Sequence, residues 1–211
     1  MNFKIILKNI IFTALLKIYF PNVTFREIKT EKELEKMYDL VWAVYALEKK
    51  WIDPSRFSIE MLKDEYETNS IKIGAFKTEN LVGTIRIILP SSVHFYVEKD
   101  FNVEFPEFLQ KEKTAELSRL VVAKEYRNKL ISFGLLKKAF EISKEIGIKY
   151  WIVVMNENMK SYFSKHFGIK FYSVKLNPFS EKHLEIRKKM KNYYKYGNPL
   201  PYLIFLDEML K

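Results

Sequence analysis

The residues best suited to chemistry lie in one stretch, Thr114–Phe140. It opens with an apolar strand that carries a carboxylate, Glu116, and a guanidinium, Arg119. A basic turn at 126–129 follows, and then a segment with the apolar spacing of a helix. The first N–H groups of a helix lack partners within it and its dipole is positive there, so a cationic turn before a helix predicts a phosphate site. A carboxylate one strand-length upstream predicts base chemistry on a phosphate-bearing substrate.

Glu116 is the candidate general base, because a carboxylate can accept a proton directly or through one water. The alternative is a structural ion pair with a lysine or with Arg119. Strict strand alternation would place residues 116 and 119 on opposite faces. A β-bulge, which is common beside active sites, would bring them to the same face. In both arrangements we expect Arg119 to orient carboxylates rather than to react.

The composition limits the class of protein. The 211 residues include no cysteine, which excludes disulfides and thiolate metal sites, and the three histidines are scattered, so we expect no metal. The net charge of +10 favours an anionic partner such as nucleic acid, anionic lipid or an acidic protein, although a biased composition explains it equally well. No nucleic-acid motif is present, so we do not expect nucleic-acid binding.

The elements must include an apolar N-terminal helix. Phe3–Phe20 is apolar but contains Lys4, Lys8 and Lys17, which argues against a membrane span, and no signal-peptide cleavage site follows it. Two interpretations remain: a helix on a membrane surface with snorkelling lysines, or a helix docked on the protein core. We expect residues 1–20 to form this helix and residues 21–211 to form one domain.

The rest of the chain alternates between strand and helix patterns. Thr30 and Glu33 predict a capping box that starts a helix to about Lys50, and Ser58 predicts the start of a short helix carrying Asp64 and Glu67. This order predicts a mixed sheet with helices on both faces, an α/β (α+β) fold. The other predicted elements are strands at 23–28, 71–76, 81–89, 150–155 and 169–174, helices at 156–167 and 180–196, and an ambiguous apolar segment at 203–210.

Part of this pattern resembles the GNAT acyltransferase superfamily. The segment from Val122 to Leu136 resembles the phosphate-binding motif, with Arg127 matching and with Leu130 and Ser132 at the glycine positions. The segment 156–169 resembles the helix after the splayed strand, with Asn158 in its usual place. The resemblance implies a GNAT-like splayed sheet flanked by helices.

A narrower resemblance covers residues 25–174. The sequence is similar to acyl-homoserine-lactone synthases and to N-acyl amino acid synthases. The lactone synthases carry an arginine where this chain has Val41, a position associated with their S-adenosylmethionine substrate, so a different acceptor is implied. The matching segments are Val44-Tyr45 with Trp51, Asp64–Glu67, Gly83–Pro90 and Ala115–Arg119.

The resemblance implies an N-acyltransferase that moves a fatty acyl group from a phosphopantetheine thioester to the amine of a small acceptor such as an amino acid. No tightly bound cofactor is implied. The glycines missing at Leu130 and Ser132 favour acyl carrier protein, with its single phosphate, over coenzyme A, unless the chain has simply drifted within a coenzyme A site. The groups implied to hold the donor are Val122, Arg127, Asn128, Lys129, Leu130, Ser132 and Asn158.

Two groups of residues, those predicted to bind the acceptor and those predicted to bind the acyl chain, can each be interpreted in two ways. Trp51, Asp64, Glu67 and Arg86 are candidates for acceptor binding, with an internal ion-pair network as the alternative for the charged residues. An acyl tunnel between the splayed strands could equally be a filled core; its candidate residues are Leu117, Trp151, Val153 and Met155.

The rival functions are a coenzyme A-dependent acetyltransferase, a lactone synthase and a non-catalytic module that binds a carrier protein or a membrane. We expect an acidic acyl carrier protein as the partner. The expected location is the cytoplasm, with peripheral contact to the inner membrane as one option.

Overall fold

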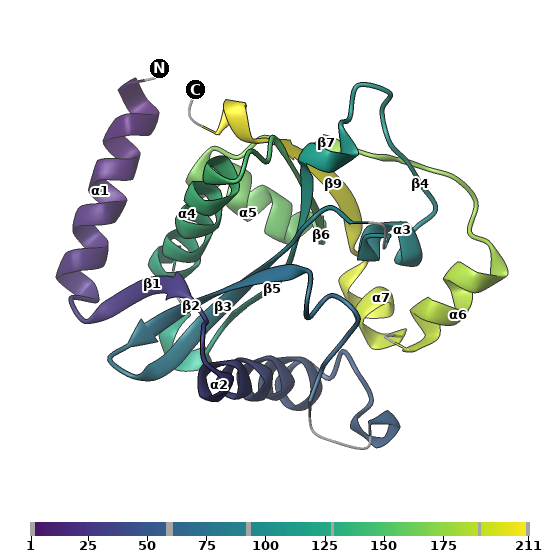
Figure 1. Ribbon diagram of the computed structural model, residues 1–211, viewed down its shortest axis with the longest axis horizontal. Helices are drawn as coiled ribbons and strands as arrows, with labels where there is room; N and C mark the ends of the chain where they lie inside the picture. Colours follow the sequence, from purple (N-terminus) through teal and green to yellow (C-terminus); the bar gives the residue numbers. More distant parts are fainter. Residues whose placement is uncertain (1–2, 58–60, 92–93, 128, 190, 210–211) are drawn as a thin grey trace.

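The structure is a computed structural model that describes residues 3–57, 61–91, 94–127, 129–189 and 191–209. A seven-stranded sheet in the order β1-β2-β3-β5-β6-β9-β7 lies between helices (Figure 1). Its neighbouring strands run antiparallel except β5 and β6, which are parallel, so the predicted mixed α/β fold is confirmed. The strands are β1 (Val23–Glu27), β2 (Ser70–Lys77), β3 (Asn80–Ile88), β5 (Thr114–Val122), β6 (Tyr150–Met155), β7 (Tyr172–Ser173) and β9 (Leu200–Phe205), with β4 (Val103–Glu104) and β8 (Lys175–Leu176) pairing separately.

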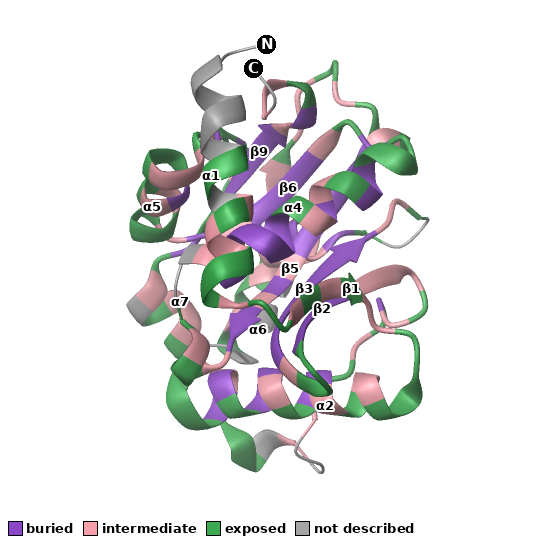
Figure 2. Ribbon diagram, turned by 90° about the vertical axis from the view of Figure 1, so that its left-hand side faces the viewer, coloured by how far each residue is buried: buried purple, intermediate pink, exposed green. Residues whose placement is uncertain are grey.

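Helices cover both faces of this sheet. On one face α4 packs on β2 and β3, and α1 packs on the outside of α4 (Figure 2). On the other face α2 lies against β3 and β5, and α3 lies against β6. The helices are α1 (Phe3–Tyr19), α2 (Glu31–Trp42), α3 (Tyr96–Asp100), α4 (Lys129–Glu145), α5 (Glu157–Phe167), α6 (Glu181–Lys189) and α7 (Lys191–Gly197).

The predicted start of α2 is confirmed. The Thr30 hydroxyl accepts a hydrogen bond from the N–H of Glu33 (3.2 Å), and the Glu33 carboxylate accepts one from the N–H of Thr30. The predicted continuation to Lys50 holds only as a π-helix, Ala43–Glu48. Such wide turns occur often at functional sites, and this one brings Tyr45 and Glu48 toward the cavity and the phosphate turn described below.

The short helix predicted around Asp64 and Glu67 is wrong, and Ser58 lies outside the described residues. Residues 61–69 form loop and turns. The Asp64 carboxylate accepts a hydrogen bond from the N–H of Tyr66 (2.9 Å), and its carbonyl accepts one from the N–H of Glu67 (3.3 Å). An aspartate that bonds the backbone two residues on stabilises a turn in place of a helix.

The C-terminal third also differs from expectation. Of the strand predicted at 169–174, only Tyr172–Ser173 pairs, and it does so at the edge of the sheet against β9. The ambiguous apolar segment at 203–210 supplies the end of β9, which pairs with β6 along its whole length, and continues as a short 3₁₀ turn, Leu206–Glu208. The basic helix predicted at 180–196 forms two shorter helices, α6 and α7.

The predicted N-terminal helix forms as α1. No helix in the described part of the chain is both long and apolar enough to cross a bilayer.

Candidate functional site

A β-bulge in β5 sets the direction of the chemical side chains. Thr84 pairs with Val121 and Arg86 with Ser118, so two residues of β5 oppose one residue of β3. Within the bulge Arg119 has a φ of 52°, the left-handed conformation that such bulges use. The predicted bulge is therefore present, and it turns Arg119 to the same face as Ser118 and Glu116.

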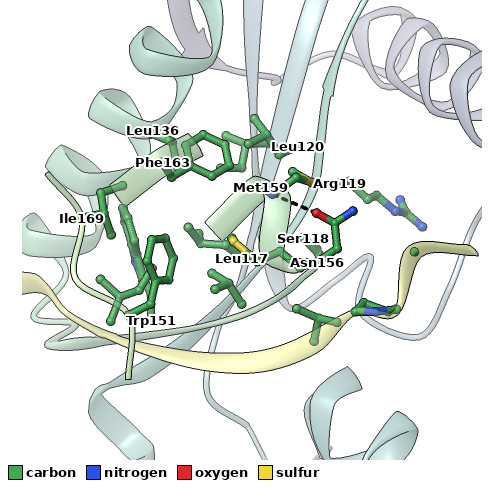
Figure 3. Close-up of a pocket in the computed structure, with 18 of the residues that line it drawn as sticks. Leu117, Ser118, Arg119, Leu120, Leu136, Trp151, Asn156, Met159, Phe163 and Ile169 are labelled. Carbon is green, nitrogen blue, oxygen red and sulfur yellow. Dashed lines mark hydrogen bonds between the residues drawn. The ribbon is translucent and has the colours of Figure 1, made fainter. Parts of the chain in front are cut away.

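A cavity opens where β5 and β6 separate. Their pairing ends at Leu117–Val153, although both strands continue beyond it. The cavity has a volume of about 110 Å³. As Figure 3 shows, Trp151, Phe163 and Ile169 lie at one end, and Ser118, Asn156 and Arg119 lie at the other. Arg119 is the only charged side chain among the described residues that line it.

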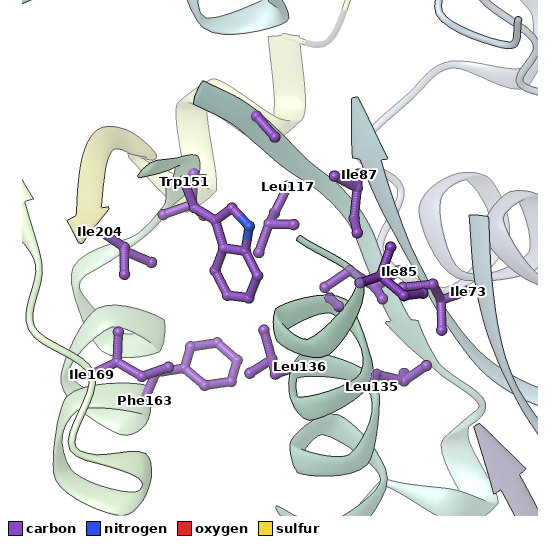
Figure 4. Packing of buried hydrophobic residues seen from close by; sticks show 14 of the residues in the cluster. Ile73, Ile85, Ile87, Leu117, Leu135, Leu136, Trp151, Phe163, Ile169 and Ile204 are labelled. Atoms are coloured by element: carbon purple, nitrogen blue, oxygen red, sulfur yellow. The ribbon is translucent and has the colours of Figure 1, made fainter. Parts of the chain in front are cut away.

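The four residues predicted for an acyl tunnel all line this cavity: Leu117, Trp151, Val153 and Met155. They also belong to the main core, with side chains less than a tenth exposed. The indole of Trp151 lies among Leu117, Leu136 and Phe163 (Figure 4) and donates a hydrogen bond to the Ser143 hydroxyl (2.9 Å). The core interpretation is therefore confirmed for these residues, and a cavity is present inside that core; its use as an acyl tunnel stays a prediction.

The predicted acceptor-side charges form one cluster with Arg119. The Arg86 guanidinium donates to both oxygens of the Asp64 carboxylate (2.9 Å each) and to Glu67 (3.4 Å). Arg119 donates to Glu67 (3.0 Å) and to Asp64 (2.6 Å). Two guanidiniums therefore share two carboxylates, an internal network that also supplies the polar end of the cavity.

Hydroxyl groups complete the cluster. Tyr96 donates to Asp64, Tyr38 donates to Glu67 (2.7 Å), and the Ser118 hydroxyl accepts a hydrogen bond from Nε of Arg86 (2.9 Å). Burial alone would raise the pKa of the Asp64 carboxyl, but the two guanidiniums outweigh it and lower that pKa below its ordinary value. Asp64 is therefore an anion with no proton to exchange near neutral pH.

Glu116 has a different environment from the other two carboxyl groups. It is 3% exposed, does not line the cavity, and accepts a hydrogen bond from the N–H of Val97 (3.3 Å) at the start of α3. Burial raises the pKa of the Glu116 carboxyl to about 8, although the backbone N–H of Val97 acts in the opposite direction. Glu116 thus keeps its proton at neutral pH while Asp64 is ionised.

The predicted phosphate turn is occupied by an internal ion pair. The Arg127 guanidinium donates two hydrogen bonds to the Glu48 carboxylate (2.5 Å each) and its Nε donates to the Val122 carbonyl (3.0 Å). Arg127 holds the pKa of the Glu48 carboxyl down at about 2, despite a smaller opposing effect of burial. A phosphate at this turn would compete with Glu48 for the guanidinium.

The other residues predicted to hold the donor, where described, lie in the first turns of two helices. Asn128 lies outside the described residues, and Lys129, Leu130 and Ser132 form the first turn of α4. Asn158 is exposed in the first turn of α5, the helix that also supplies Met159 and Phe163 to the cavity.

Val122 offers a backbone N–H on the cavity side of β5. The N–H of Ala123 bonds the carbonyl of Val82 on β3 (2.9 Å). Hydrogen bonding alternates along an antiparallel pair, so the N–H of Val122 points away from β3, toward the side where β6 has separated.

The sequence reasoning missed Tyr193 of α7. Its ring lines the cavity and packs edge-on against Trp51 (5.0 Å between ring centroids), which in turn packs against Tyr45 (5.1 Å). Burial, followed by the nearby Tyr45, Asp100 and Glu116, raises the pKa of the Tyr193 hydroxyl. Its sequence neighbourhood is dominated by lysines, so only its alignment on a helix face could have indicated a buried role.

Among the described residues, no group of three or more histidine or acidic side chains is arranged to hold a metal ion.

Comparison with known proteins relates this arrangement to acyltransferases. A family model described as N-acyl amino acid synthase FeeM matches residues 36–178. No curated protein matches the sequence.

Solved structures share the fold at low sequence identity. BjaI, a CoA-dependent acyl-homoserine lactone synthase solved with SAM and isopentyl-CoA, is 16% identical over 89% of this chain and 86% of its own, with a TM-score of 0.67. FeeM, an N-acyl amino acid synthase from uncultured soil microbes, is 15% identical over 89% and 92%, with a TM-score of 0.58. The AHL synthase LasI is 15% identical over 87% and 89%, with a TM-score of 0.63.

The raised pKa of Glu116 predicts a pH-dependent stability. Between its ordinary pKa of 4.5 and about 8 the unfolded chain loses this proton while the folded chain keeps it, so the stability falls as pH rises. Glu116→Gln keeps an acceptor for the N–H of Val97 but does not ionise. We expect the variant to melt above the wild type by an amount that is small near pH 5 and on the order of 5–10 °C near pH 8.5.

Glu98→Gln is the matched control, because Glu98 also accepts a backbone N–H of this segment, that of Phe95 (2.8 Å), but has a lowered pKa. It should melt below the wild type by nearly the same amount at pH 5 and at pH 8.5, because the stability that the ionised Glu98 contributes is present above its ordinary pKa of 4.5 and is lost only as pH falls below it. A melting difference for Glu116→Gln that is equal at both pH values would contradict the raised pKa.

Proposed function

Because the chain belongs to the FeeM family of N-acyl amino acid synthases, whose model matches most of its length, we propose that it transfers a fatty acyl group from a phosphopantetheine thioester to the amine of an amino acid. Membership of the family implies transfer of an acyl group to an amine. The identities of the acyl donor and of the acceptor are what we propose. The observation that carries it is the cavity between β5 and β6, apolar at one end and bounded by Arg119 at the other.

The acyl chain would occupy the apolar end. Its thioester carbonyl would then lie near the separated part of β5, where the N–H of Val122 could stabilise the developing oxyanion. The amine nitrogen attacks this carbon and the C–N bond forms. The C–S bond then breaks, the nitrogen loses a proton, and the sulfur leaves as a thiolate that takes up a proton.

Direct attack fits the residues available. The chain has no cysteine to form an acyl-enzyme. Ser180 and His183 do lie 2.6 Å apart, but they are at the exposed start of α6 and neither lines the cavity.

Glu116 remains the proposed base, and its burial requires an intermediary. Ser118 lies two residues away on the same strand face and lines the cavity, so the proton would pass by way of its hydroxyl or a water beside it. With a pKa raised to about 8, Glu116 can accept the proton only in the fraction of the enzyme in which it is ionised, and that fraction grows as pH rises toward 8. In that fraction the carboxylate is a stronger base than an exposed one and is better matched to an amine.

Arg119 supports an acceptor that carries a carboxylate. It is the one charged side chain of the described cavity lining, and an amino acid presents a carboxylate next to its amine. Val41, where the lactone synthases carry an arginine, is fully buried against Met37 and Val121. That position therefore offers no charge to S-adenosylmethionine, which weighs against the lactone-synthase alternative.

An acyl carrier protein is the proposed donor. Leu130 and Ser132 place side chains in the first turn of α4, where a pyrophosphate would need close approach to the backbone, whereas a single phosphate diester needs less room. The net charge of +10 would attract an acidic carrier protein. BjaI is described as CoA-dependent, so coenzyme A is the donor to compare.

The product tests the function as a whole. Cells that produce the protein should accumulate an N-acylated amino acid that mass spectrometry of lipid extracts detects, and cells with an empty vector should not. Purified enzyme given the matching acyl carrier protein and amino acid should form the same compound and release the free thiol in equal amount. Release of methylthioadenosine in place of this product would favour a lactone synthase and contradict the proposal.

Removal of the proposed base should slow turnover. Glu116→Gln should lower kcat by roughly 10²–10⁴-fold, the usual contribution of general base catalysis. Because the acceptor amine titrates in both enzymes, the informative quantity is the ratio of wild-type to variant rate, which should rise with pH and level off above about 8. The stability control Glu98→Gln should keep nearly wild-type turnover; an equal loss in both variants would indicate damage to the fold around α3.

The ion pair of Arg127 with Glu48 gives a two-sided test of the donor site. Arg127→Ala should raise KM for the acyl donor by about tenfold, the value of one charge-assisted hydrogen bond, and leave KM for the acceptor unchanged. Glu48→Gln should lower KM for the donor, because it releases the guanidinium for the phosphate. Acyl carrier protein and coenzyme A thioesters of the same chain should be compared in both variants.

Arg26 supplies the control, since it also pairs with a glutamate, Glu33 (2.6 Å), but lies on the edge strand β1. Arg26→Ala should leave both KM values unchanged. Equal effects of Arg127→Ala on donor and acceptor would contradict the assignment of the phosphate turn.

A further inference from the structure

Helix α1 uses only one side to contact the protein. Thr13, Leu16 and Phe20 face α4, where the Thr13 hydroxyl accepts a hydrogen bond from Lys137 (3.2 Å). These positions lie on one side of a helix with 3.6 residues per turn. The core-docked interpretation of α1 therefore accounts for this side alone.

The opposite side of α1 exposes large apolar residues. Ile18 is 70% exposed, Tyr19 67%, Ile10 59% and Ile11 46%. Ile11 and Ile18 are seven residues apart, about two turns, so they lie one above the other at the centre of this side, while Ile10 and Tyr19 lie at its two borders. In Figure 1 this helix stands at the edge of the molecule beside α4, and in Figure 2 it lies in front of α4 on the face toward the viewer. Four exposed side chains of this size along one helix form a patch of the kind that marks an interaction surface.

Positive charge borders this apolar side. The groove between α1 and α4, with a volume of about 290 Å³, is lined by Lys17, Lys137 and Lys138 and by one acidic residue, Glu141. Lys17 is exposed, and Lys138 pairs with Glu141 (3.6 Å), which leaves an excess of positive charge along the groove. An apolar helix side next to lysines is the arrangement of helices that lie in the interface of anionic lipid.

The geometry points to α1 as a membrane-surface helix: we propose that its outer side, Ile10, Ile11, Ile18 and Tyr19, inserts into the interface of an anionic bilayer while its inner side stays on α4. A second copy of the chain is a less favourable partner for this side of α1, because pairing two such faces would bring the lysines of both copies together. The inference goes beyond the proposed function and is argued from α1 and α4 alone. Acyl transfer at such a surface would release an amphiphilic product next to the bilayer that can take it up.

Vesicle sedimentation with the full chain tests this proposal. The protein should sediment with vesicles that contain phosphatidylglycerol, bind pure phosphatidylcholine much more weakly, and lose affinity when salt is raised from about 0.05 M to about 0.5 M. The variant Ile11→Asp/Ile18→Asp should bind anionic vesicles roughly tenfold or more weakly, because it removes two apolar side chains from the interface and adds like charge to that of the lipid.

The control variant Phe108→Asp/Leu184→Asp removes two other exposed apolar residues, from the loop at 105–110 and from α6. It should bind vesicles as the wild type does. Equal binding by Ile11→Asp/Ile18→Asp, or loss in the control alone, would overturn the assignment to α1. A concentration-dependent dimer that the α1 variant abolishes, without vesicle binding by the wild type, would identify a second copy as the occupant.

Two further measurements distinguish a wrong membrane proposal from a misfolded variant and from a wrong proposed function. Circular dichroism and the melting temperature should match the wild type in both variants, since all four positions are exposed. Acyl transfer with soluble substrates should be unchanged in the α1 variant, because none of its residues lines the cavity. Vesicle binding without acyl transfer would leave the membrane proposal standing and reject the proposed function.

Discussion

The separation of β5 from β6 beyond Leu117–Val153 is the constraint on which the site depends. Two parallel strands that stayed paired would fill the space between them with hydrogen bonds and leave no cavity. Beyond that point β3 is the only described strand that pairs with β5, and on this stretch β5 accommodates the bulge at Arg119. The cavity and the reorientation of Arg119 therefore have one structural origin, which explains how an apolar space ends at a guanidinium without an intervening layer of core.

The carboxyl groups near the cavity have different protonation states because their surroundings differ. Asp64 lies between two guanidiniums and stays ionised, while Glu116 lies among apolar groups at the start of α3 and has a pKa of about 8. Burying Arg86 without partners would be strongly unfavourable, so the Asp64 pair is needed for the fold as well as for the site. The same fold thus holds a fixed anion and an exchangeable proton close to one strand, a division that acid–base chemistry requires.

Local patterns in the sequence predicted the elements that local physics determines. The apolar run of β5 and the capping box of α2 follow from periodicity and side-chain type, whereas the four predicted residues that line the cavity were placed there by the resemblance to a splayed sheet. The loop at 61–69 was misread because the Asp64 side chain bonds the backbone, and that bond is stabilised by Arg86 and Arg119 from distant strands. Tyr193, and the pairing of Arg127 with Glu48, depend on segments far apart in the chain, which no local spacing encodes.

The π-helix Ala43–Glu48 joins the two halves of the proposed site. Tyr45 at its centre lines the cavity beside Trp51, and Glu48 at its end holds Arg127 at the phosphate turn. Tyr45 and Glu48 are three positions apart in the chain, so a shift of this segment that released Arg127 would also move the wall of the cavity. A donor phosphate that displaces Glu48 would therefore act on the acyl and acceptor space through a single turn of backbone. A wide turn of the kind that occurs often at functional sites thus connects the cavity wall directly to the partner of Arg127.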